Sequence, residues 1–212
     1  MKNFRTTARF TLMMAMALCM LTMNSCQMLG GKKTSFAIVV DAETYLQAKD
    51  AIDAYRNLLE SEGLHTYLLA REWERPEQIR EELIQLYGQQ PPLEGAVFIG
   101  DIPIPMIRDA QHMTSAFKMD QIRFPFHRSS VPSDRFYDDF DLVFDYLEAD
   151  TERPLYHYYS LSADSPQKVQ TNIYTGRIKP PVNGKDKYEQ IREYLLKVVA
   201  ERSSPNPLDN AI

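Results

Sequence analysis

The run Phe36-Ala37-Ile38-Val39-Val40, closed by Asp41, constrains the fold of this chain more than any other feature. Five consecutive apolar residues predict a strand that is buried on both faces, as the strands of a parallel sheet are. Asp41 is suited to cap a following helix, because its carboxylate can accept hydrogen bonds from free backbone N–H groups. The run therefore predicts a parallel strand that leads directly into a helix.

The same alternation of strand and helix continues along the chain. Apolar residues recur at helical spacing over 45–59, and residues 65–70 predict a second strand. A second helix is predicted over 76–88, where Pro76 suits its first turn, and a third strand over 95–101. Short links between such elements imply right-handed crossovers. We therefore predict an α/β fold, a three-layer sandwich with a mainly parallel sheet.

The pattern changes after the third strand. Residues 102–140 are rich in proline, aromatic and charged residues without clear periodicity, and we expect an irregular excursion over the carboxyl end of the sheet. Residues 172–178 predict a further strand, and 185–202 predict a helix. The chain then ends in a segment, 203–212, that reads as a linker and a truncated end.

The first residues carry a different signal. Three basic residues, an apolar stretch over 10–23 and then Ser25-Cys26 resemble a bacterial lipoprotein signal peptide. The resemblance implies a signal peptide over 1–25, a lipidated Cys26, a tether over 26–34 and anchoring to a membrane of the bacterial cell envelope, the outer rather than the inner one. An ordinary cleaved signal peptide or an uncleaved anchor are the alternatives. The apolar stretch is shorter than the roughly 20 residues that span a bilayer.

Cysteine content and charge exclude two classes of function. Of the two cysteines, Cys19 would leave with the leader and Cys26 would carry the lipid, so no thiol remains for catalysis, a disulfide or a metal site. Removing the leader takes away three basic residues and changes the formal net charge from −5 to −8. An acidic chain speaks against a nucleic-acid partner, which favours a basic face.

Three segments in the body carry a second resemblance. They are Val97-Phe98-Ile99-Gly100-Asp101, then Val131-Pro132-Ser133-Asp134-Arg135-Phe136-Tyr137-Asp138-Asp139, then Tyr174-Thr175-Gly176-Arg177-Ile178. In this order they resemble the gingipain-type cysteine peptidases, which have a caspase-like architecture. The motif positions are Asp101, Ser133, Tyr137, Gly176 and Arg177. The resemblance implies that residues 35–202 correspond to the amino-terminal, non-catalytic subdomain.

In that family the catalytic His and Cys lie beyond the Gly-Arg strand, in a second subdomain, so the resemblance implies no catalytic residue in this chain. Three functions remain open. In the first, the chain is part of a longer envelope peptidase and is inactive alone. In the second, it is a free-standing membrane-anchored binding lipoprotein. In the third, it is one of two chains that assemble a peptidase. We favour the first, because the chain stops just past 203–207; its partners would be the membrane and a missing subdomain or second chain.

Acidic residues gather between the second and third of these segments. They are Asp134, Asp138, Asp139, Asp141 and Asp145. Such a cluster could be a solvated acidic turn, a calcium site or a set that includes a substrate-facing acid, since calcium takes several oxygen ligands. Its spacing does not fit an EF-hand.

Four residues of the three segments carry expectations of their own. Asp101 follows a parallel strand, where it could face a ligand or hold the next loop through backbone N–H groups. Arg177 and Asp134 are expected to support structure near the carboxyl edge of the sheet, and Gly176 to admit a close backbone neighbour.

Overall fold

The computed structural model describes residues 34–113 and 118–204. These residues belong to one compact unit that begins at Thr34. The expected signal peptide, the lipidated Cys26, nearly all of the tether and residues 205–212 lie outside the described residues. No helix in the described part of the chain combines the length and apolar character needed to cross a membrane.

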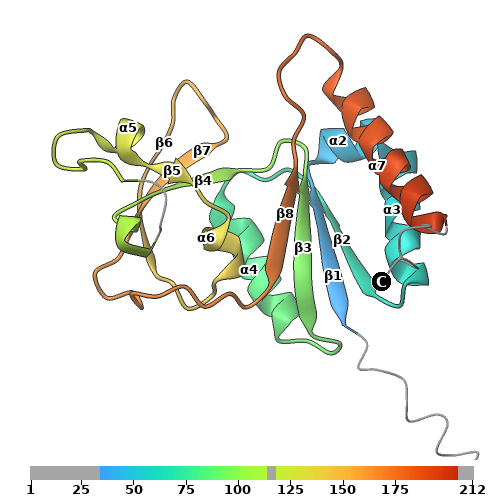
Figure 1. Cartoon of the computed structure of the whole chain (residues 1–212), viewed down its shortest axis with the longest axis horizontal. Coiled ribbons are helices and arrows are strands. Elements are labelled where there is room, and N and C mark those ends of the chain that lie inside the picture. Colours follow the sequence, from blue (N-terminus) through green and yellow to red (C-terminus); the bar gives the residue numbers. More distant parts are fainter. Residues whose placement is uncertain (1–33, 114–117, 205–212) are drawn as a thin grey trace, which may run out of the picture. The chain divides into compact units, whose positions relative to one another are not determined.

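A four-stranded parallel sheet, sheet A, forms the centre of the unit (Figure 1). Its strands are β1 (Ser35–Val40), β2 (His65–Ala70), β3 (Leu93–Ile99) and β8 (Tyr174–Ile178), in the order β2-β1-β3-β8. All three strand pairs are parallel. Each strand corresponds to one that the sequence predicted, and every residue of β1 is buried.

Helices cover both faces of sheet A, which confirms the three-layer α/β architecture. Phe36, Ile38 and Val40 of β1 pack with residues of α3 (Lys49–Ser61) and α7 (Lys187–Ser203). The alternate residues of β1 pack on the other face with α4 (Pro76–Tyr87). Figure 1 shows α3 and α7 on one side of the sheet and α4 on the other.

The first predicted helix is two helices. It divides into α2 (Ala42–Gln47) and α3 at Ala48, whose φ of −119° is not helical. Ala48 is itself fully buried, so the apolar periodicity continues across the break and conceals it in the sequence. Asp41 caps α2 as predicted, because its side chain accepts a hydrogen bond from the backbone N–H of Thr44.

The expected irregular excursion was wrong, because the segment contributes to a second sheet. Sheet B contains β4 (Ile104–Arg108), β5 (Val131–Pro132), β6 (Phe144–Ala149) and β7 (Tyr156–Leu161), in the order β5-β4-β7-β6. β4 and β7 are parallel, and the two outer pairs are antiparallel. Three short helices complete this region: η2 (Gln111–Met113), α5 (Phe126–Ser129) and α6 (Arg135–Asp138).

Sheet B and α6 share a core with the α4 face of sheet A. Ile107, Phe136, Tyr137 and Tyr159 belong to the same buried cluster as the apolar residues of α4. The segment leaves the carboxyl end of β3, but its buried side chains pack onto one face of sheet A.

Candidate functional site

The three sequence segments that carry the peptidase resemblance meet at Arg177. Its guanidinium group donates to a carboxylate oxygen of Asp134 at 2.7 Å, and to the carbonyl oxygens of Ile102 at 3.0 Å and Pro103 at 3.3 Å. The side chain is only 17 % exposed, and it lies over the ring of Phe98 on β3. One arginine on β8 therefore holds the loop after β3 and the start of α6 together.

Tyr137 strengthens the same junction from α6. It is fully buried, and its hydroxyl donates to the carbonyl oxygen of Pro103 at 2.9 Å. Burial raises the pKa of Tyr137 well above its usual value, so the hydroxyl stays protonated and acts as a donor. Ser133 accepts a weak hydrogen bond from the backbone N–H of Arg135, which is the behaviour of a turn-forming serine.

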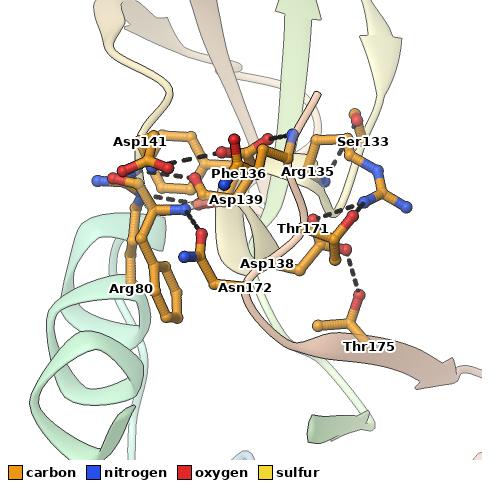
Figure 2. A network of polar contacts seen from close by, with 12 residues as sticks. Arg80, Ser133, Arg135, Phe136, Asp138, Asp139, Asp141, Thr171, Asn172 and Thr175 are labelled. Atoms are coloured by element: carbon orange, nitrogen blue, oxygen red, sulfur yellow. Dashed lines mark hydrogen bonds and ion pairs between the residues drawn. The ribbon is translucent and has the colours of Figure 1, made fainter. Parts of the chain in front are cut away.

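Asp138 links α6 to the edge strand β8. Its carboxylate accepts from the hydroxyl of Thr175 at 2.9 Å and from Arg135 at 3.0 Å, as Figure 2 shows. Arg135 also donates to the hydroxyl of Thr171. Burial raises the pKa of Asp138, and the hydrogen bond from Thr175 and the charge of Arg135 oppose that shift. The carboxylate of Asp138 therefore links α6 to β8, and its burial there destabilises the charged form.

Asp139 is fully buried and ties its own loop to the segment before β8. One carboxylate oxygen accepts from the backbone N–H of Gln170 at 2.6 Å, and the other accepts from the backbone N–H of Asp141 at 3.3 Å. The side-chain oxygen of Asn172 accepts from the backbone N–H of Phe140 at 2.7 Å (Figure 2). Asp141 itself is exposed.

Arg80, on α4, satisfies the backbone of this acidic loop. Its guanidinium group donates to four carbonyl oxygens, those of Phe136, Asp139, Phe140 and Leu142, at 2.8 to 3.1 Å. Burial lowers the pKa of Arg80, but an arginine stays protonated in proteins. Arg80 was missed in the sequence, although its position four residues after Pro76 and three before Leu83 places it beside the buried face of α4.

The acids predicted as a calcium site are used in different ways. Asp134 pairs with Arg177, Asp138 and Asp139 accept from the donors given above, and Asp145 lies exposed on β6. Within residues 34–113 and 118–204, no group of three or more His, Cys, Asp or Glu side chains is placed to hold a metal ion. The carboxylates of Asp134, Asp138 and Asp139 already act as acceptors for internal donors, which is a structural use of these acids. Calcium binding stays a prediction.

The expected role of Gly176 was wrong. A Cβ atom at this position would have no heavy atom within 4 Å, so no neighbouring backbone approaches it closely. Gly176 is exposed, and β8 pairs with β3 alone among the strands of the described residues. The glycine leaves the surface of an edge strand open.

Asp101 lies at the carboxyl edge of sheet A and faces two lysines. Its carboxylate accepts from Lys179 Nζ at 2.9 Å and from Lys187 Nζ at 2.5 Å. Burial raises the pKa of Asp101, but the hydrogen bonds and charges of the two lysines outweigh it, and the net shift is downward. The loop after β3 is instead held by Asp41, which accepts from the backbone N–H of Asp101 at 2.7 Å.

Gly100 makes this junction possible. Its φ of +83° lies in the left-handed region, and a Cβ there would lie 2.3 Å from a carboxylate oxygen of Asp41. The lysines that face Asp101 gave no signal in the sequence, because they follow β8 and begin α7, far along the chain from β3.

No protein-family model, curated protein or solved structure matches this chain. Its function therefore has to be inferred from the geometry of the described residues and from the resemblances in its sequence.

Proposed function

We propose that residues 35–202 are the non-catalytic subdomain of a gingipain-like cysteine peptidase of the cell envelope, inactive alone, and that the open edge of β8 receives a second α/β subdomain. The observation that carries this proposal is the asymmetry of sheet A. Its two edge strands are β2 and β8, and the outer edge of each pairs with no strand of the described residues. Only the β8 side also exposes large apolar side chains.

Two tyrosines define that side. Tyr174 on β8 is 54 % exposed, and Tyr194 on α7 is 52 % exposed. A hollow of about 390 Å³ lies between β8 and α7, and its lining includes Ile178, Ile191 and Tyr194. No large apolar side chain of β2 is exposed. An unpaired strand beside an apolar hollow favours addition of a further strand, because its backbone groups and side chains would both gain partners.

The inactivity of the chain alone follows from its composition. The nucleophile in this peptidase class is a thiolate with a neighbouring base. The only cysteines are Cys19 and Cys26, and in this proposal one is removed with the leader and the other is acylated. The catalytic residues then belong to the second subdomain, on the same chain or on another one.

The docking surface can be tested with residues 34–212 by analytical ultracentrifugation and binding of a hydrophobic dye. We expect the folded protein to self-associate or to bind dye, and Tyr194→Lys to reduce both. Leu46→Lys is the matched control, because Leu46 is an exposed apolar residue on α2, away from the lining of this hollow. A dye-silent monomer would overturn the proposal.

A free-standing membrane-anchored binding lipoprotein is the second candidate. The observation that favours it is a second, adjoining hollow at the carboxyl edge of sheet A, beside Asp101. This function requires a finished polar surface at β8, so a dye-silent monomer would support it. The two candidates thus give opposite results in the same experiment.

A further inference from the structure

The hollow beside Asp101 lies outside the carboxyl ends of β3 and β8, which are neighbouring parallel strands of sheet A. Parallel α/β sheets place ligand sites outside the carboxyl ends of their strands. Here the space measures about 350 Å³ and lies between Gly100-Asp101 and the β8–α7 connection, which rises at the top of Figure 1.

The lining of this hollow is basic in an acidic protein. Lys179, Lys185 and Lys187 line it, and Asp101 is the single acidic residue in the lining. The formal charge of the lining is therefore about +2, whereas the whole chain carries −5. The Lys185 ammonium group makes no ion pair or hydrogen bond with any described residue. A ligand with two negative charges would balance this site.

The positions of two of the lysines are set by the fold. Lys179 and Lys187 converge on the carboxylate of Asp101, whose backbone is held by Asp41. An ammonium group has three donors, so contact with Asp101 leaves each lysine with donors for a ligand. Each side chain is 35 to 40 % exposed, so these donors are accessible.

The remaining wall is apolar. Pro180, Pro181, Val182 and Ile191 line the hollow between the lysines. Val182 is fully exposed. A ligand that fits this lining carries its charge at one end and an apolar body at the other, the usual composition of small-molecule sites.

We propose that this hollow binds a phosphate monoester with an apolar substituent. The phosphate group carries nearly two negative charges at pH 7 and accepts hydrogen bonds at three oxygens, which suits a lining with three lysines. The phosphate contacts Lys179, Lys185 and Lys187, and the substituent lies against Pro181 and Val182. The proposal rests on the lining of this hollow and not on the docking of a second subdomain at β8, although the two hollows share Lys179, Pro180, Pro181 and Ile191.

Titration calorimetry of the full chain with phenyl phosphate tests the proposal. We expect saturable binding to one site, weakened about fivefold or more by Lys185→Gln. The thermal midpoint should stay unchanged in this variant, because the Lys185 ammonium group has no partner among the described residues. Lys197→Gln, an exposed lysine elsewhere on α7, is the matched control and should leave the affinity within about twofold.

A second pair of variants reports on Asp101. Asp101→Asn should strengthen binding, because it removes the one negative charge in the lining, whereas Asp164→Asn, at an exposed position outside it, should not. The proposal is overturned if no saturable binding occurs, if benzyl alcohol binds as well as phenyl phosphate, or if the control variants change affinity as much as the test variants.

Discussion

Arg177 and Arg80 each place a guanidinium group inside the described unit. Arg80 donates to four backbone carbonyl oxygens, and Arg177 donates to two of them and to the carboxylate of Asp134. These oxygens lie in loops or in the short helix α6, and the arginines supply hydrogen bonds that the backbone of these segments does not. Loss of either side chain would leave several buried acceptors without a donor, which costs more than loss of an exposed ion pair.

Arg177→Ala is expected to lower the free energy of unfolding by about 2–4 kcal/mol, because it leaves Asp134 and the carbonyl oxygen of Ile102 without their donor. The carbonyl oxygen of Pro103 loses one of its two donors and keeps the hydroxyl of Tyr137. Urea denaturation measures the change. Arg202→Ala, which removes an exposed partner of Glu62, is the control and should change stability by less than about 0.5 kcal/mol. A loss of similar size in both variants would refute a supporting role for Arg177.

The raised pKa of Asp138 predicts that its contribution to folding stability changes with pH in the direction opposite to that usual for an aspartate. Because burial raises its pKa in the folded state, the folded protein binds this proton more tightly than the unfolded chain. Its contribution to stability is therefore greatest at acidic pH and decreases as the pH rises through the raised pKa.

The difference in unfolding free energy between the wild type and Asp138→Asn should thus decrease from about pH 4 to pH 7. Thermal or urea unfolding at several pH values measures it. Asp164→Asn, at an exposed position, should show no such trend. A difference that increases with pH would contradict the raised pKa.

At the scale of elements, the sequence predicted sheet A well and sheet B poorly. The strands of sheet A are continuous apolar runs between helices with clear periodicity, so local pattern identifies them. β4 contains a proline, β5 has two residues, and five of the six residues of β6 are exposed, so none gives a strong strand pattern. β4 pairs with β7 across a long loop, and local sequence carries no information about such pairing.

The residues of the candidate site were likewise only partly predictable from the sequence. The motif residues Asp134, Tyr137 and Arg177 could be named from the sequence, because a resemblance marked them. Their partners Ile102 and Pro103 act through backbone oxygens, which side-chain identity does not reveal. Lys187 faces Asp101 only because the fold brings the start of α7 to the end of β3.

Arg80→Met tests the link between α4 and the acidic loop. The variant keeps an apolar side chain on α4 but removes the donor to four carbonyl oxygens, so hydrogen exchange in residues 136–142 should accelerate. We also expect a loss of about 2–3 kcal/mol in unfolding free energy. Arg56→Met on α3 is the control and should leave exchange in 136–142 unchanged. Unaltered exchange in Arg80→Met would show that other contacts order the loop.

At the scale of the whole molecule, the described unit is one part of the chain, and the expected lipid anchor lies outside it. Two acyl signals hold a protein on a membrane far more firmly than one chain does. A lipidated amino terminus would therefore confine the β8 edge and the basic hollow to the envelope, close to a membrane surface.

Cys26→Ser should release the protein from the membrane fraction, because serine cannot form the thioether that carries the diacylglyceryl group. Fractionation followed by immunoblotting measures the release, and Cys19→Ser is the matched control that should remain membrane-bound. Mass spectrometry of the wild-type amino terminus gives the independent check. An unmodified terminus at a residue other than Cys26 would disprove lipidation.

The two hydrogen bonds of Asp41 have a consequence for folding. One carboxylate oxygen caps α2 next to β1, and the other holds the backbone of Asp101 after β3. The second of these contacts spans 60 positions of the chain, so it can form only after β3 has added to β1. Formation of the β1–α2 junction and pairing of β3 with β1 are thereby coupled. A folding intermediate that has only one of the two lacks one of the two hydrogen bonds of Asp41. This carboxylate makes assembly of β1, α2 and β3 more cooperative than local helix and strand preferences alone would.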